Sequence, residues 1–412
     1  MTVTKSPGEY DSAHLLESSP DLSSSATRVA RPRRAAPADA VRPTRAEVNL
    51  AALRHNLHAV KKFAGGAHVW SVLKADGYGH GAPAVARTLE RAGAEGFCVA
   101  LFEEAVELRD AGIRVPILVM GGYYGASHGD VIARGLVPVV YDLAQVEGFA
   151  RAVRASGLQA PFGVHLKVDT GMARLGLRHH ELSRFADGLA QFPEVRVSGL
   201  MTHLACADAV SNAETEEQML RFDESTALLA KHGVRPEVRH AANSAALMRA
   251  SAKLDAVRPG IAVFGLSPVP IEEELWQVMR VRTEVVALRT IEVGDTVGYS
   301  ALWKAQRRTT VATIPMGYAD GLSRSLTNRG HVLIRGKRAP IIGAVSMDMS
   351  MIDVTDVEGI SLRDEAVVLG NQEGPLGKDS ITAAQVASES GTIAWEVLTS
   401  ISRRVPRFYR EP

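Results

Sequence analysis

The residues best suited to chemistry stand at the ends of short apolar runs, where polar side chains are unusual. They are Lys74, Lys167 with Asp169, His203, Asn243 with Ser244, and Arg258. Each of them alone is most simply explained as a solvated or structural side chain. Their repeated position at the same end of successive runs indicates instead that they belong to one site.

The last two apolar runs carry groups suited to a phosphate. Asn243 and Ser244 open a predicted helix, SAALMRA, and Gly260 and Ile261 lie in a predicted tight turn. Free backbone N–H groups at such positions, together with a hydroxyl, form a common phosphate site in barrel enzymes.

Lys74 and Arg258 indicate which phosphate is expected. A lysine amine forms a Schiff base with an aldehyde. A cofactor that is both aldehyde and phosphate is pyridoxal 5′-phosphate (PLP), whose protein must also supply a partner for the pyridine nitrogen. Arg258 is the candidate partner, and because a guanidinium keeps its proton it would leave the ring a weaker electron sink. We therefore predict PLP as the cofactor and no metal.

The pattern of the elements that position these residues predicts a (β/α)₈ barrel. Eight apolar runs alternate with amphipathic stretches of helical length over about 230 residues, which is typical of such barrels. The runs lie at 69–74, 96–101, 116–122, 136–142, 162–169, 197–204, 237–242 and 254–260. Barrel enzymes build their sites at the carboxyl ends of the strands, which is where the polar residues stand.

The chain divides into three parts by composition. Residues 1–42 are rich in Ser, Ala, Pro and Arg, and we expect a disordered tail. Residues 43–277 form the predicted PLP-binding barrel domain, although a first strand at about 43–49 could join the next domain. Asn49 is expected to cap the first helix. Residues 278–412 form a predicted mostly β domain, closed by a helix near 381–391.

Composition limits the partners. Lys+Arg 47 against Asp+Glu 46 gives a net charge of +1, which disfavours nucleic-acid binding driven by charge. No apolar run reaches the roughly 18 residues of a membrane span, and the N-terminus has no apolar segment of a secretory signal. Two cysteines do not make a disulfide framework. We expect a cytoplasmic protein with a small-molecule substrate, no nucleic acid and no membrane.

Nine motifs, in order from about residue 42 to 409, resemble alanine racemases, which are PLP enzymes of fold type III. They are SVLKADGYGHG, HLKVDTGMARLG, GLMTHLACAD, HAANSAA, VRPGIAVFGLSP, VGYSALW, IPMGYADGLSR, GAVSMDMSMIDVTD, and TIAWEVL followed by RVPRFY. The resemblance implies an isomerase that interconverts L-alanine and D-alanine and supplies D-alanine for peptidoglycan.

The resemblance also assigns roles to residues of the barrel. Lys74 matches the Schiff-base lysine, which is one of two catalytic bases. The implied cofactor contacts are Tyr78, Ser244 and the amide of Ile261 at the phosphate, His203 beside the ring and Arg258 at its nitrogen. Lys167 matches a lysine that is N-carboxylated in many members, and Arg174 matches the arginine that pairs with this carbamate and holds the substrate carboxylate.

Residues of the β domain match the other half of the site. Tyr299 resembles the second base, which in this family comes from the neighbouring subunit. Met347 and Asp348 match a pair that reaches the substrate carboxylate across the same interface. Tyr318 and Arg324 resemble residues near the channel to the site. The resemblance thus implies a homodimer with composite sites. Two bases are needed because inversion removes a proton from one face and returns it to the other.

Departures from the family pattern leave some specificity open. Trp395 and Phe264 stand where a tyrosine is common, and Arg45 replaces a common tryptophan. We expect Trp395 to keep the entrance narrow and the enzyme selective for alanine; the other outcome is a wider channel that admits serine.

Three alternatives compete with this assignment: a racemase of broad specificity for serine, lysine or arginine, a decarboxylase of the same fold type, and a non-catalytic PLP-binding protein. Lys167 argues against the broad-specificity racemase, because a carbamylated lysine is associated with the alanine enzymes. The order of the motifs argues against the decarboxylase, and the β domain argues against the non-catalytic protein.

Overall fold

The computed structural model describes residues 40–122, 125–159 and 161–411. The predicted tail at 1–42 therefore lies outside the described residues except for its last three positions. Of these, Arg42 donates two hydrogen bonds to the carboxylate of Asp320, at 3.0 and 2.7 Å.

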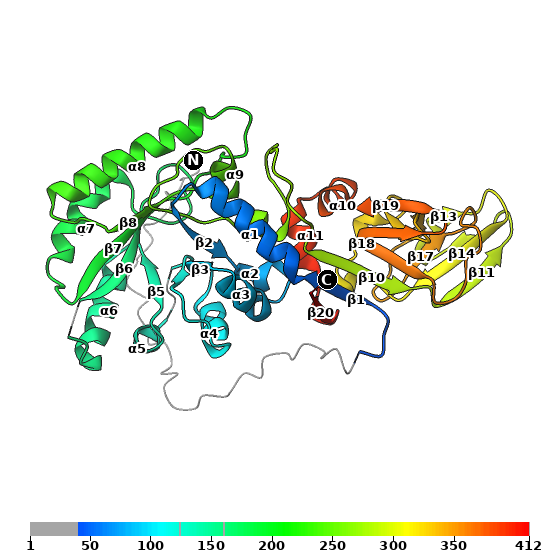
Figure 1. Ribbon diagram of the computed structural model, residues 1–412, viewed down its shortest axis with the longest axis horizontal. Coiled ribbons are helices and arrows are strands. Elements are labelled where there is room, and N and C mark those ends of the chain that lie inside the picture. The colour runs from blue at the N-terminus through cyan, green and yellow to red at the C-terminus, as the bar shows by residue number, and fades with distance from the viewer. Residues whose placement is uncertain (1–39, 123–124, 160, 412) are drawn as a thin grey trace, which may run out of the picture. The chain divides into compact units, whose positions relative to one another are not determined.

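A closed barrel of eight parallel strands forms the N-terminal part of the fold (Figure 1). The ring closes where the last strand pairs with the first, with His68 opposite Ala256. The strands are β2 (His68–Val72), β3 (Gly96–Val99), β4 (Ile117–Val119), β5 (Val137–Val140), β6 (Phe162–Lys167), β7 (Val195–Met201), β8 (Val238–His240) and β9 (Ala256–Val257). Each coincides with one of the eight apolar runs, so the barrel prediction is confirmed.

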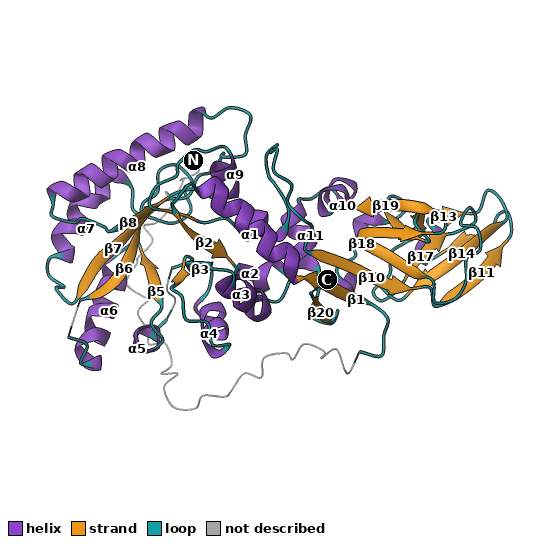
Figure 2. Cartoon of the chain, in the orientation of Figure 1, coloured by secondary structure: helices purple, strands orange, loops and turns teal. Residues whose placement is uncertain are grey.

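Helices connect the strands and lie outside them (Figure 2). Asn49 begins the first helix as predicted, since its side chain accepts a hydrogen bond from the Ala52 amide at 3.0 Å. The helices are α1 (Leu50–Ala64), α2 (Lys74–Tyr78), α3 (Ala82–Arg91), α4 (Phe102–Asp110), α5 (His128–Ala133), α6 (Leu143–Ser156), α7 (Leu182–Leu189), α8 (Ala213–Lys231) and α9 (Ser244–Met248). None of the helices in the described part of the chain is long and apolar enough to cross a membrane.

A ten-stranded sheet forms most of the C-terminal part, as expected for a mostly β domain. Its first strand, which precedes the barrel in the chain, pairs antiparallel with β10 and parallel with β20, so this strand belongs to the sheet. The strands are β1 (Arg45–Asn49), β10 (Met279–Glu284), β11 (Ala287–Ile291), β14 (Thr309–Ile314), β15 (His331–Ile334), β16 (Lys337–Ile342), β17 (Ser350–Asp353), β18 (Glu365–Gly374), β19 (Gly377–Ile381) and β20 (Arg407–Arg410).

Smaller elements complete this part. β12 (Thr296–Val297) and β13 (Trp303–Lys304) pair as a two-stranded ribbon, and two helices, α10 (Ala383–Ser390) and α11 (Ala394–Ser400), lie between β19 and β20 in the chain. Burial differs between the two parts. All four residues of β3 are buried, as in parallel strands covered on both faces, whereas burial alternates along β10.

Candidate active site

One cavity of about 490 Å³ gathers most of the polar residues expected at the strand ends. Eight predicted site residues line it, and they come from the ends of β2, β7, β8 and β9 and the segments that follow these strands. They are Lys74, Tyr78, His203, Asn243, Ser244, Arg258, Gly260 and Ile261. The barrel topology therefore brings together residues that are up to 187 positions apart in the chain, from 74 to 261.

Lys74 follows β2 directly and begins the short helical turn α2. Burial lowers the pKa of its amine, and the nearby positive charge of Arg174 lowers it further, whereas the Glu104 carboxylate acts in the opposite direction. A lowered pKa increases the fraction of neutral amine, which is the form that attacks a carbonyl carbon.

The hydroxyls of Tyr78 and Ser244 line the same cavity, next to the backbone amides of residues 260–262. The Ser244 Oγ accepts hydrogen bonds from the amides of Gly260 at 3.0 Å and Ala262 at 3.4 Å, and Asn243 caps α9 through the Ala246 amide. A Cβ atom added at Gly260 would lie 2.2 Å from the Tyr78 hydroxyl, so only glycine allows this approach.

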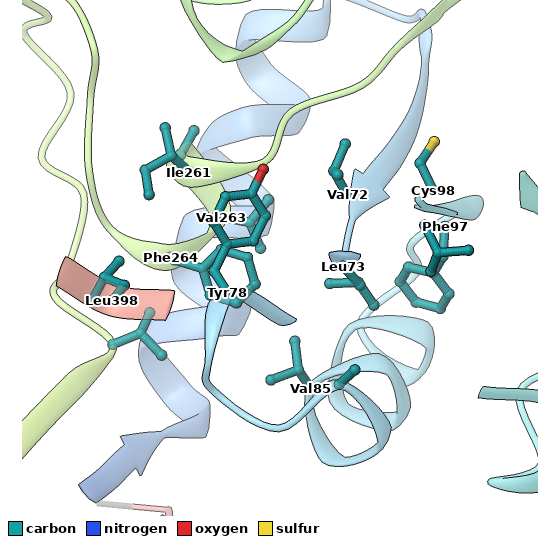
Figure 3. Close-up of a cluster of buried hydrophobic side chains, with 14 of the residues drawn as sticks. Val72, Leu73, Tyr78, Val85, Phe97, Cys98, Ile261, Val263, Phe264 and Leu398 are labelled. Atoms are coloured by element: carbon teal, nitrogen blue, oxygen red, sulfur yellow. The ribbon is translucent and has the colours of Figure 1, made fainter. Parts of the chain in front are cut away.

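Tyr78 is held by packing. Its ring lies against Phe264, with 5.0 Å between ring centroids, and its hydroxyl points toward the segment that carries Ile261 (Figure 3). Burial raises the pKa of the Tyr78 hydroxyl, so it remains a neutral donor. With the Ser244 hydroxyl and the Ile261 amide, this donor set has the chemistry of a phosphate site.

Arg258 is fully buried and has no carboxylate partner among the described residues. Its Nη2 donates to the carbonyls of Thr202 at 2.7 Å and Ala241 at 3.1 Å, and its Nη1 donates to His240 Nδ1 at 2.5 Å. Burial lowers the pKa of Arg258 to about 10, so the guanidinium stays charged at neutral pH. It provides a fixed positive charge in the wall of the cavity.

Two buried histidines extend this network and were missed by the sequence prediction. Because Arg258 only donates, His240 accepts at Nδ1, and its Nε2 proton is directed to His165 Nδ1 at 2.8 Å. The ring of Trp70 stacks on His165 at 5.5 Å between centroids. Both histidines lie inside apolar runs, so the criterion of a polar residue in an apolar strand, applied along whole strands and not only at their ends, would have found them.

Lys167 and Arg174 lie beside the cavity without lining it. Lys167 is buried at the end of β6, and burial together with the charges of Arg174 and Arg258 lowers its pKa to about 8. Asp169 holds the loop that leads to Arg174 by accepting hydrogen bonds from three successive amides, at residues 171–173. Within the described chain neither cation has a carboxylate within ion-pair distance.

His203 lies in the cavity as a neutral imidazole. Its pKa falls to about 3 because the side chain is buried and because Arg258 and Arg174 are close. The described residues include no group of three or more His, Cys, Asp or Glu that could hold a metal ion.

The β-domain residues line a second cavity, of about 690 Å³. It contains all five predicted residues of this part, which are Tyr299, Tyr318, Arg324, Met347 and Asp348. Tyr299 is 72% exposed and Met347 is 53% exposed, which is unusual for large apolar side chains. Asp348 accepts a hydrogen bond from Arg404 at 2.7 Å. The structure therefore places the predicted residues in two groups, one in the barrel and one in the β domain.

A closed barrel followed by a β domain, with a half-buried lysine just after the first barrel strand, defines a two-domain enzyme fold. The sequence matches the family described as alanine racemase, N-terminal domain, over residues 48–268, and alanine racemase, C-terminal domain, over residues 278–409. The chain therefore belongs to the alanine racemase family. The predicted resemblance, the fold class and the assignment to an isomerase class of enzyme are confirmed.

Individual relatives agree over almost the whole chain. The alanine racemase of Sorangium cellulosum (strain So ce56) is 61% identical over 380 residues, which cover 90% of this chain and 100% of that protein. The structure of alanine racemase from Bacillus anthracis with bound L-Ala-P has a TM-score of 0.83 and 33% identity, covering 90% of this chain and 95% of that one. The structure of alanine racemase from Bartonella henselae with covalently bound pyridoxal phosphate has a TM-score of 0.80 and 29% identity, covering 89% and 99%.

Proposed function

We propose that this chain is a PLP-dependent alanine racemase that interconverts L-alanine and D-alanine. The observation that carries the proposal is the barrel cavity, where the Lys74 amine, whose pKa is lowered, lies with the hydroxyls of Tyr78 and Ser244. The relative that is 61% identical bears the name alanine racemase, which supports the same substrate.

The residues present fit PLP. Lys74 would hold its aldehyde carbon, and Tyr78, Ser244 and the amide of Ile261 would hold its phosphate, within the cradle that Gly260 keeps open. Arg258 would face the pyridine nitrogen, with its charge fixed by the carbonyls of Thr202 and Ala241. When bound, PLP withdraws electrons from the substrate Cα and makes its proton acidic. The Bartonella henselae relative, with covalently bound pyridoxal phosphate, supports this assignment.

Two groups of this chain would exchange the Cα proton. The neutral Lys74 amine takes the proton on one face and the ammonium returns it there. On the other face, the phenolate of Tyr299 of the partner subunit takes the proton and the phenol returns it. The exposure of Tyr299 in a cavity of its own supports a role that is completed by a second copy. In the same way Met347 and Asp348 would reach the substrate carboxylate of the partner's barrel, where Arg174 is its main cation. The functional unit is thus a homodimer with two composite sites.

The Lys167 amine is proposed to be N-carboxylated. With a pKa of about 8, a substantial neutral fraction exists near neutral pH. The neutral nitrogen attacks the carbon of CO₂, an N–C bond forms, one oxygen takes the negative charge, and the nitrogen gives its proton to water. The resulting anion would replace repulsion between Lys167 and Arg174 by a bidentate, charge-assisted pair.

The proposed cellular role is to supply D-alanine for peptidoglycan from the cytoplasm. The two cysteines, Cys98 and Cys206, are free thiols, which agrees with a reducing compartment.

The test is an L-alanine to D-alanine conversion assay on the purified protein with PLP, followed by borohydride reduction and peptide mapping. We expect racemisation in both directions and a reduced cofactor on the peptide that contains Lys74. Attachment at Lys167, or the absence of a yellow cofactor band after incubation with PLP, would overturn the assignment.

A further inference from the structure

The turn that carries Lys74 has an unfavourable backbone. Ala75, Asp76 and Tyr78 all have positive φ angles, of 52°, 59° and 51°, and Gly77 continues the same left-handed turn at 60°. Left-handed conformation costs free energy at each residue that has a Cβ, so three such residues in one turn need support from outside.

Glu104, in the first turn of α4, gives that support. Its Oε1 accepts a hydrogen bond from the Ala75 amide at 2.6 Å. Its Oε2 accepts from the amides of Ala100 at 2.8 Å and Leu101 at 3.1 Å, just after β3. A single carboxylate therefore ties the carboxyl end of β2 to the carboxyl end of β3.

The contact with Ala75 acts directly on Lys74. The Ala75 N–H lies in the same rigid peptide plane as the Lys74 carbonyl, so fixing this N–H fixes the ψ angle of Lys74. The ψ angle sets how the Lys74 Cα–Cβ bond is aimed relative to the turn. The hydrogen bond is exposed, so water would replace it if Glu104 were lost. The loss would release the turn without leaving a buried polar group unsatisfied.

A role in helix capping explains only half of these contacts. Oε2 closes the start of α4 in the ordinary way, but Oε1 turns away from the helix to a residue 29 positions earlier in the chain. Glu181 provides the comparison, since it caps its own short helix through the Arg178 amide at 2.7 Å. Only Glu104 joins the cap to the lysine turn.

We propose that Glu104 is a positioning residue, which holds the Lys74 backbone at the start of the left-handed turn and so aims its amine into the barrel cavity. The inference rests on the proposed function of Lys74. Charge supports it as well. Arg174 lowers the pKa of Lys74 and Glu104 raises it, while Lys167 and His203 interact electrostatically with the same amine. Glu104 is thus the anion that opposes the positive charge of Arg174 at Lys74.

The experiment compares Glu104→Gln and Glu104→Ala with two controls. Glu103→Gln removes the same charge from the neighbouring exposed position, and Glu181→Gln alters a glutamate that only caps a helix. We measure kcat and KM for alanine, the thermal midpoint, and the pH at which the visible band of the Lys74-bound cofactor changes.

We expect kcat to fall about 10- to 100-fold in both Glu104 variants, with KM within twofold, because misaiming a reacting group affects the reaction more than binding. The spectral midpoint should move to lower pH, since loss of an anion disfavours the protonated form. In both controls kcat should stay within twofold of the wild-type value, and the spectral midpoint should equal that of the wild type.

The inference is overturned if Glu104→Gln binds cofactor at Lys74 and keeps both kcat and the spectral midpoint of the wild type. A change in thermal midpoint alone would also overturn it, since that result assigns Glu104 to capping. Failure of the proposed function is distinguishable, because borohydride would then not attach the cofactor to Lys74 in the wild-type protein. Glu104→Gln preserves side-chain volume and one amide oxygen, so the test stands even where Glu104→Ala does not fold.

Discussion

Trp395 lies at the cavity together with the exposed Ile393, so the entrance carries an indole that offers one donor and no acceptor. We expect the bulk of this ring to keep the enzyme selective for alanine, with the phosphate held by other groups. The difference of a hydroxyl group typically changes discrimination by about 1–3 kcal/mol, so some serine activity should remain. The measurement is the ratio of kcat/KM for L-alanine to that for L-serine, in the wild type and in Trp395→Tyr.

A lower ratio in Trp395→Tyr agrees with the narrow entrance. If the wild-type protein handles lysine or arginine as well as alanine, the narrow entrance is wrong and the broad-specificity reading takes its place.

Lys167 gives a second prediction for a single residue. Lys167→Ala should raise KM for alanine, because Arg174 loses its proposed anionic partner and is held less well for the substrate carboxylate. Small carboxylates such as acetate should restore part of the loss by filling the same place. Lys378→Ala, at an exposed lysine paired with Glu373, is the control and should change nothing. An unmodified ammonium at Lys167 in a high-resolution map of CO₂-equilibrated protein would refute the carbamate.

The polar residues found from sequence were those at strand ends, because an unusual side chain in an apolar run is visible without a structure. The hydrogen bonds that join Arg258, His240 and His165 depend on which barrel strands bring their side chains together. The sequence alone does not show which of these side chains face one another. Glu104 was missed for a different reason. From the sequence, a glutamate in the first turn of a helix is expected to cap that helix. Only the structure shows that one carboxylate oxygen of Glu104 accepts a hydrogen bond from the Ala75 amide.

Among the elements, the turn after β9 gives a prediction about the phosphate cradle. Gly260→Ala should weaken PLP binding by about tenfold or more, since the new methyl would lie 2.2 Å from the Tyr78 hydroxyl and one of them must move. The dissociation constant of PLP, measured from its visible absorption, tests this. Removing the hydroxyl with Tyr78→Phe in the Gly260→Ala background should recover part of the affinity.

Gly129→Ala is a suitable control, because an added Cβ there meets no atom within 4 Å. Equal PLP affinity in Gly260→Ala and the wild type would contradict the cradle.

The strands of the barrel were predictable because each is an apolar run of strand length bounded by turn residues. The shortest strands of the β domain were not, since β12 and β13 have two residues each and such lengths carry no periodicity. Strand β1 shows a further limit. Its apolar residues Ala46 and Val48 indicate a strand, but only pairing with β10 and β20 decides that it joins the sheet.

For the whole molecule, four histidines whose pKa is lowered in the folded chain predict acid sensitivity. The pKa of His165 and of His203 is lowered to about 3, that of His80 to about 4, and that of His240 well below its usual value, in each case chiefly by burial. The unfolded chain binds their protons near pH 6.5 and the folded chain does not. The free energy of unfolding should therefore fall as the pH decreases below about 6.5, by about 1.4 kcal/mol per pH unit for each histidine.

Urea unfolding between pH 7 and pH 5 measures this slope. His165→Gln keeps an acceptor for His240 and should reduce the slope by one histidine's share, whereas His58→Gln, at an exposed position, should leave it unchanged. A stability that does not vary between pH 7 and pH 5 would contradict the neutral buried histidines.

The central claim is that each site combines Lys74 of one subunit with Tyr299 of the partner subunit, and subunit mixing tests it most directly. Lys74→Ala and Tyr299→Ala should each be inactive alone. After unfolding and joint refolding, random pairing should restore about a quarter of wild-type activity, because half of the dimers are mixed and each holds one intact site of two. If mixed dimers form from folded subunits and remain inactive, Tyr299 does not act across the interface and the composite site is wrong.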